Sequence, residues 1–125
     1  MLEQPDPLTS QVIGFAIKVH RTLGPGLLES VYEECLAYEF SKANIECKRQ
    51  VSLPIIYEGV RLDCSYRMDF VVDNRLLIEL KSVDRLLPIH DAQILTYLRL
   101  SGCKTGLLMN FNQVALKDGL KRFVL

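Results

Sequence analysis

The spacing of apolar and polar residues changes from a helical to an extended pattern near the middle of the chain. Before about residue 44, apolar side chains recur every three or four positions, and Gly24-Pro25-Gly26 interrupts them. From Val51 onward, apolar residues alternate with others, as on a strand with one buried face. The pattern predicts helices over about residues 10–23, capped by Thr9 or Ser10, 27–44 and 90–101, and strands over about 51–57, 60–72, 76–83, 105–110 and 120–125.

The order of these elements is typical of an α/β domain. Without the short last strand it runs α-α-β-β-β-α-β, which predicts a mixed β-sheet flanked by helices. Turns are expected at Glu58-Gly59 and at Asp73-Asn74. The length of 125 residues suits a single domain over residues 1–125, and the sequence contains no repeat or interdomain linker.

Composition narrows the class of protein. The apolar fraction is 49% and the charged fraction 24%, as in soluble globular domains rather than disordered chains. No run approaches 18 apolar residues and the first ten residues lack a signal-peptide pattern, so we expect a cytoplasmic protein with no membrane span. The net charge of zero excludes a general polycation. Residues 86–125 nevertheless hold five bases and two acids, so a local basic surface could hold a polyanion.

The cysteine and histidine residues do not suggest a zinc or redox centre. No C-x-x-C occurs, so the cysteines are interpreted as reduced and mostly buried thiols. Neither histidine has a partner at ligand spacing, and we interpret His20 as a packing residue and His90 as a helix-start residue. The cysteines are Cys35, Cys47, Cys64 and Cys103.

Charged residues interrupt two strands that otherwise look buried. Glu79 and Lys81 share one face of a very apolar strand, and Asp69 interrupts the preceding strand in the same way. Asp69 can lie opposite Glu79 only if Val72 pairs with Leu76, across a three-residue loop; a two-residue turn would place the carboxylates on opposite faces. The alternative is an edge strand with a solvated face.

Polar residues in two helices have competing interpretations. Glu29 lies on the same helical arc as Leu36 and is either a site residue or the N3 partner of a cap at Gly26. Gln93 and Tyr97 share a face at i, i+4 and are either site residues or a half-exposed amide beside an amphipathic tyrosine.

Four motifs in order resemble the GxxExxY protein family, a group within the PD-(D/E)XK nuclease superfamily near the RecB-type nucleases. The resemblance runs from about Val12 to Phe123. It departs from the family pattern at Met68, where the superfamily's namesake has proline, and at Asn112, where glycine is expected. The motifs are Gly26-Leu27-Leu28-Glu29-Ser30-Val31-Tyr32, Asp69 followed by Glu79-Leu80-Lys81, Gln93-Ile94-Leu95-Thr96-Tyr97, and Gly106-Leu107-Leu108-Met109-Asn110-Phe111.

The resemblance implies a restriction-endonuclease-like core and a metal-dependent phosphodiesterase that cleaves DNA or RNA. It implies that Mg²⁺ or Mn²⁺ binds to Asp69, Glu79 and the Leu80 carbonyl, with Glu29 reaching the metal directly or through water. Lys81 would orient the nucleophile or stabilise the transition state. Gln93 and Tyr97 would support the site or touch the substrate backbone, and Arg67 would contact phosphate.

Two other functions remain open from the sequence. A catalytically silent nuclease-fold module would bind nucleic acid or a protein partner without cutting. An interaction protein unrelated to nucleic acid would explain the fold but not the buried charges. So short a chain carries no additional DNA-binding segment, which leaves a homodimer or a partner protein open as the means of holding a substrate.

Overall fold

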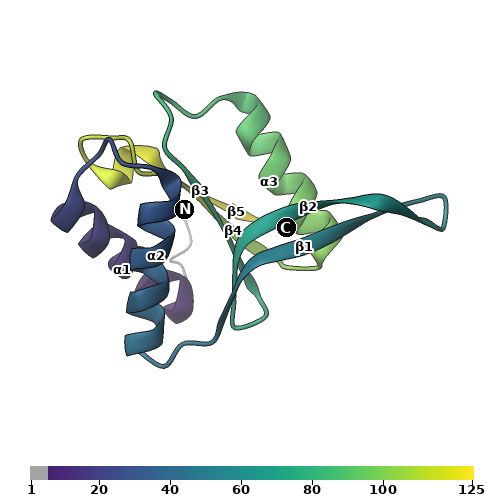
Figure 1. Cartoon of the computed structure of the whole chain (residues 1–125), viewed down its shortest axis with the longest axis horizontal. Coiled ribbons are helices and arrows are strands. Elements are labelled where there is room, and N and C mark those ends of the chain that lie inside the picture. The colour runs from purple at the N-terminus through teal and green to yellow at the C-terminus, as the bar shows by residue number, and fades with distance from the viewer. Residues whose placement is uncertain (1–5) are drawn as a thin grey trace.

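The fold is described from a computed structural model that covers residues 6–125, apart from the side chains of residues 63 and 64 (Figure 1). The prediction for the Cys64 thiol therefore lies outside the described residues. The helices are α1 (Pro7–Leu23), α2 (Glu29–Lys42), α3 (Pro88–Ser101) and the 3₁₀ turn η1 (Leu116–Gly119), and the strands are β1 (Cys47–Tyr57), β2 (Val60–Val72), β3 (Leu76–Lys81), β4 (Thr105–Asn110) and β5 (Leu120–Val124).

The strands form one five-stranded sheet in the order β1-β2-β3-β4-β5. Strands β3 and β4 are parallel and α3 connects them, whereas the other neighbours are antiparallel. A parallel pair needs such a crossover, while antiparallel strands are joined by short turns. The predicted α/β fold with a mixed sheet flanked by helices is confirmed.

Two apolar clusters cover the two faces of the sheet. Helices α1 and α2 pack against one face, where Phe40 meets Phe70 and Tyr32 meets Phe111. Helix α3 packs against the other face, where Ile94 and Leu98 belong to the same cluster as Leu77. Strand β3 lies in the middle of the sheet and is buried from Leu76 to Leu80, so Glu79 lies inside the molecule, Lys81 is partly exposed, and the solvated edge-strand alternative is wrong. None of the helices in residues 6–125 is long and apolar enough to cross a membrane.

Some predicted boundaries and caps are wrong. Asp6, not Thr9 or Ser10, caps α1, because its side chain accepts a hydrogen bond from the Thr9 N–H at 2.9 Å. Strand β1 begins at Cys47, four residues earlier than predicted, because its polar first residues pair with β2. Helix α2 begins at Glu29 and β3 ends at Lys81, each two residues inside the predicted limit.

The tyrosine of the GxxExxY motif fastens the turn between α1 and α2. Its hydroxyl accepts a hydrogen bond from the Leu27 N–H at 3.1 Å and donates one to the Gly24 carbonyl at 2.7 Å. The Tyr32 ring stacks on Phe111 with a centroid distance of 4.5 Å. Gly26 has a φ of 95°, a conformation that favours glycine. The glycine and tyrosine of this motif are therefore explained by structure alone.

Replacing Tyr32 with phenylalanine is expected to lower the free energy of unfolding by about 1–2 kcal/mol, because two backbone groups lose their partner. Urea unfolding measures this change. Tyr38→Phe is the matched control, since Tyr38 lies on the same helix and is exposed. Equal stability of the Tyr32→Phe and Tyr38→Phe variants would contradict the role of the Tyr32 hydroxyl in fastening the turn.

Candidate active site

The acidic pair lies at a fork in the sheet. Strands β2 and β3 pair from Val72↔Leu76 to Phe70↔Ile78, and the β1–β2 hairpin then extends beyond β3 (Figure 1). The register is the one required for a shared site, with Asp73, Asn74 and Arg75 forming the three-residue connection. Asp69 and Glu79 are the next residues on the two arms of the fork, so the structure brings them together.

Each carboxylate accepts a hydrogen bond from the opposite strand. The Asp69 N–H donates to Glu79 Oε1 at 3.1 Å, and the Leu80 N–H donates to Asp69 Oδ2 at 2.7 Å. These bonds replace the backbone ladder where the strands separate, and they hold both carboxylates in place. A strand residue directs its N–H and C=O toward the same neighbour, so the Leu80 carbonyl faces the fork.

Burial strongly disfavours the charged form of this pair. Glu79 is only 5% exposed, and burial together with the nearby charge of Asp69 raises its pKa to about 8. Burial also raises the pKa of Asp69, to which the charge of Glu33 adds. Lys81 acts in the opposite direction on both carboxyl groups without outweighing burial. Without a cation the pair therefore retains a proton at neutral pH.

The donor set fits a hard divalent cation. Mg²⁺ is commonly bound by one or two carboxylates and keeps several water ligands, so Asp69, Glu79 and the Leu80 carbonyl are sufficient protein ligands. A cation between the carboxylates would also remove their mutual repulsion. Among the described side chains of residues 6–125, no three His, Cys, Asp or Glu groups lie close enough to hold a metal ion. Water molecules would complete the coordination, as is usual for Mg²⁺.

Lys81 is the last residue of β3, and its backbone is hydrogen-bonded to the residue that follows β4. Its carbonyl accepts a hydrogen bond from the Phe111 N–H at 2.9 Å. Two residues further, the buried Asn110 side chain accepts from the Val83 N–H at 3.1 Å and donates to the Val83 carbonyl at 3.0 Å. Lys81 forms no ion pair within 4.0 Å with the described residues, and its charge acts on Asp69 and Glu79 from a longer distance. Asn110 thus positions the segment that follows Lys81.

Helix α3 brings two predicted site residues to the same region. Tyr97 is 5% exposed, and burial, followed by the charge of Glu79, raises its pKa. The nearby Gln93 side chain acts in the opposite direction on the Tyr97 pKa without outweighing burial. Gln93 is itself partly exposed, as the alternative of a half-exposed amide expects, whereas Tyr97 is buried.

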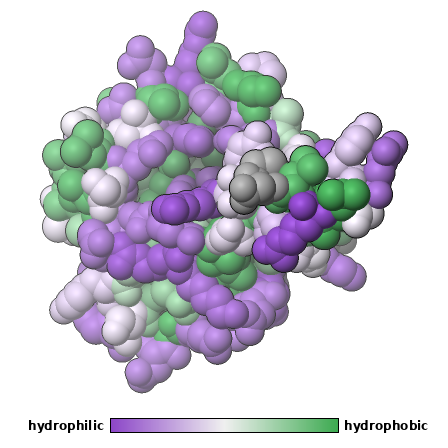
Figure 2. Space-filling view, turned by 45° about the vertical axis from the view of Figure 1, so that its right-hand side comes forward, coloured by the Kyte–Doolittle hydropathy of each residue, from purple (hydrophilic) through white to green (hydrophobic). Residues whose placement is uncertain are grey.

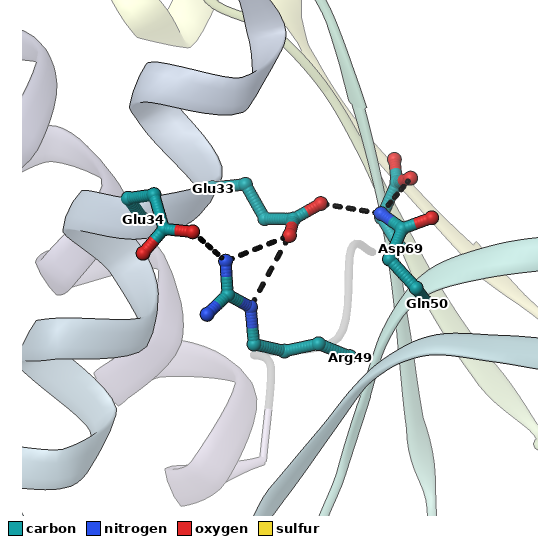
Figure 3. A network of polar contacts seen from close by, with 5 residues as sticks. All are labelled: Glu33, Glu34, Arg49, Gln50 and Asp69. Atoms are coloured by element: carbon teal, nitrogen blue, oxygen red, sulfur yellow. Dashed lines mark hydrogen bonds and ion pairs between the residues drawn. The ribbon is translucent and has the colours of Figure 1, made fainter.

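Sequence reasoning missed Gln50 and Glu33, which are joined to Asp69 in a polar network (Figure 3). Gln50 lies opposite Asp69, between the pairs Arg49↔Phe70 and Val51↔Met68, and has a φ of 50°, which is uncommon for a residue with a side chain. Its amide donates to Glu33 and, at 3.4 Å, to Asp69 Oδ1. Arg49 Nη2 lies 2.9 Å from Glu33 Oε2 and also pairs with Glu34.

Two predicted site residues, Glu29 and Arg67, lie away from the Asp69–Glu79 pair. Glu29 is exposed at the first position of α2, so its interpretation as the N3 residue of a cap at Gly26 is wrong. It lines an open cavity of about 450 Å³ together with Ser82, which follows Lys81. Arg67 is exposed and pairs with Ser52 in the β1–β2 hairpin.

The two other polar predictions agree with the structure. His20 is buried, and its Nε2 lies 2.7 Å from the Gln113 carbonyl oxygen, as expected of a packing residue. His90 Nδ1 accepts a hydrogen bond from the Leu87 N–H at the start of α3. The described cysteines, Cys35, Cys47 and Cys103, are free thiols. The prediction that they are buried holds for Cys103, whereas Cys35 and Cys47 are only partly buried.

Comparison with known proteins agrees with this geometry. Residues 6–123 match the family model of the PD-(D/E)XK nuclease superfamily. The crystal structure of SSO0001 is similar in fold, with a TM-score of 0.56 and 22% identity over 77% of this chain. The match covers 50% of SSO0001, so this chain spans about half of its length. Among curated proteins no match is found. The mixed sheet with its flanking helices is consistent with a restriction-endonuclease-like core, and the chain belongs to the PD-(D/E)XK nuclease superfamily.

Proposed function

We propose that this chain is a metal-dependent phosphodiesterase that hydrolyses the backbone of DNA or RNA. The observation that carries the proposal is the Asp69–Glu79 pair, in which Glu79 is buried and Asp69 partly buried, so that the fully ionised pair needs a cation to compensate its charge. Within the superfamily, we propose that the chain belongs to the GxxExxY group, near the RecB-type nucleases, because its four motifs resemble those of that group. The alternative is a silent module that binds nucleic acid or a protein partner without cutting.

Asp69, Glu79 and the Leu80 carbonyl would hold Mg²⁺ or Mn²⁺. When bound, the cation would neutralise charge on the phosphodiester and lower the pKa of water. Glu29 would reach this region through water, from its position beside Ser82. Asp69 remains oriented throughout by the Leu80 N–H and the Gln50 amide.

Lys81 would act on the substrate directly. Its ammonium group, at the end of β3 beside the carboxylates, would orient the attacking water or donate a hydrogen bond to the oxygen that gains charge in the transition state. Tyr97 would limit the access of bulk water to Glu79, and Gln93 would support the orientation of Tyr97. Arg67, exposed on the hairpin, would contact a phosphate outside the reacting group.

A cleavage assay tests this function. Labelled single- and double-stranded DNA and RNA are incubated with the protein in Mg²⁺, Mn²⁺ or EDTA, and products are expected only with metal. Lys81→Met is expected to lower the rate by roughly 100-fold or more, because a group that stabilises transition-state charge is lost. Lys48→Met, on exposed β1, is the matched control.

Two results would contradict the proposal. If folded wild-type protein yields no products from any substrate, the silent module is the better description. Full activity of Lys81→Met would remove Lys81 from the mechanism even if cleavage occurs.

A further inference from the structure

An apolar groove lies beside the acidic pair, between α3 and the β1–β2 hairpin. It has a volume of about 280 Å³. Its lining includes Ile55 and Tyr66 from the hairpin and Ile89, Gln93, Tyr97 and Leu100 from α3. Figure 2, in which this side of the molecule comes forward, shows apolar surface on the hairpin interspersed with polar residues.

Large apolar side chains at the groove are exposed to solvent and are not part of the buried core. Tyr66 is 54% exposed and Ile89 is 67% exposed. The rings of Tyr66 and Tyr97 have centroids 5.8 Å apart and are tilted by 43°. Together they form an aromatic surface that runs from the buried Tyr97 to the exposed Tyr66. Aromatic side chains exposed beside an apolar floor are typical of surfaces on which nucleobases stack.

The groove is continuous with the candidate active site. Tyr97 lines the groove and is close enough to Glu79 for the carboxylate charge to act on its hydroxyl. Tyr66 precedes Asp69 by three residues on β2, which corresponds to roughly 10 Å along a strand. A nucleic acid strand whose phosphate lies at the acidic pair would therefore pass the groove within a few nucleotides.

Polar groups in the groove match the edge of a base. The Gln93 amide can donate and accept hydrogen bonds, and the Thr96 hydroxyl can do the same. The exposed cation Arg99 lies beside the groove, where it donates to Thr96 Oγ1 at 3.0 Å. The groove thus combines stacking, a few hydrogen-bonding groups and nearby positive charge.

We infer that this groove binds an unpaired nucleobase of the substrate strand, so that the substrate is single-stranded or has an unpaired segment near the cleavage point. This inference rests on the proposed function and names its substrate class. A paired base cannot enter the groove because it remains within the duplex stack, and extruding it requires unstacking. An apolar side chain of a second copy of this chain is the competing occupant.

Binding rather than cleavage tests the inference. Fluorescence anisotropy in EDTA measures the affinity of the full chain for a labelled single-stranded oligonucleotide and for the duplex of the same sequence. The single strand is expected to bind at least about tenfold more tightly. Tyr66→Ala is expected to lose about tenfold in affinity for the single strand, which corresponds to about 1.4 kcal/mol and lies within the range for stacking of one base.

Two variants serve as controls. Tyr66→Phe keeps the ring and is expected to bind within twofold of the wild type. Tyr57→Ala removes another exposed tyrosine from the same hairpin but outside the groove, and is expected to bind normally. Equal losses in Tyr57→Ala and Tyr66→Ala, or no loss in either, would overturn the inference.

The remaining outcomes separate this inference from the proposed function. If the protein binds duplexes more tightly and cleaves them, and cleavage requires Lys81, the proposed function is supported but the groove does not bind a base. A chain that binds single strands through Tyr66 but cleaves nothing retains the groove and loses the function. If the wild type is a dimer in sedimentation and Tyr66→Ala is a monomer, a second copy occupies the groove and the inference is wrong.

Discussion

Replacing Asp69 with asparagine is expected to reduce metal-dependent cleavage by roughly 1,000-fold, which corresponds to about 4 kcal/mol of lost transition-state stabilisation. The amide oxygen can still accept the hydrogen bond from the Leu80 N–H, so the strand fork keeps its geometry. The charge that attracts the cation is lost. Single-turnover cleavage at saturating protein measures the effect.

The control for this variant is Asp73→Asn, a matched change at an exposed aspartate in the β2–β3 connection. It is expected to cleave at the wild-type rate. Cleavage by Asp69→Asn within tenfold of the wild type would mean that Asp69 does not hold the cation. The far-ultraviolet circular dichroism of both variants should be unchanged.

Glu79→Gln is expected to be more stable than the wild type at high pH in the absence of metal. The folded-state pKa of Glu79 is about 8, above its ordinary value of 4.5, so the folded protein binds more protons than the unfolded chain between these pH values. The stability associated with this proton is present below about pH 4.5 and is lost as the pH rises through 8. One pKa unit corresponds to about 1.4 kcal/mol, so the wild type loses up to about 5 kcal/mol over this interval.

Urea unfolding in EDTA at several pH values between 5 and 9 measures this difference. The glutamine variant keeps an acceptor for the Asp69 N–H, so its stability should match the wild type near pH 5 and exceed it by several kcal/mol near pH 9. Parallel pH profiles for the two proteins would show that Glu79 ionises normally and that burial does not raise its pKa.

The boundaries that were predicted well lie where the sequence carries strong local signals. Strand β2 covers the predicted residues because turns at Glu58-Gly59 and Asp73-Asn74 delimit it, and α3 ends as predicted at Gly102, which adopts a left-handed conformation. The start of β1 was missed because Lys48, Arg49 and Gln50 lack alternation. Their strand conformation depends on pairing with β2, which no local pattern reports.

In the candidate site, too, features with a local sequence pattern could be predicted and features that depend on tertiary packing could not. From the sequence, the meeting of Asp69 and Glu79 was conditional on a three-residue loop, because strand alternation and loop length together determine register, and the structure has that loop. The link from Gln50 to Asp69 could not be predicted, since it depends on a positive φ within a strand and on the packing of α2 against the sheet. Motif matching singled out Glu29, yet the α2 residue joined to Asp69 through Gln50 is Glu33, one helical turn later.

The central claim is that Asp69 and Glu79 together hold a divalent cation, and calorimetric titration with Mn²⁺ tests it most directly. At pH 7 we predict one site in the wild type, with proton release approaching one per ion, because the proton held by Glu79 must leave. Buffers of different ionisation enthalpy measure that release. The affinity should fall at least about tenfold in Asp69→Asn and in Glu79→Gln, but not in Lys81→Met. Equal affinity in all four proteins, or no binding to the wild type, would contradict the claim.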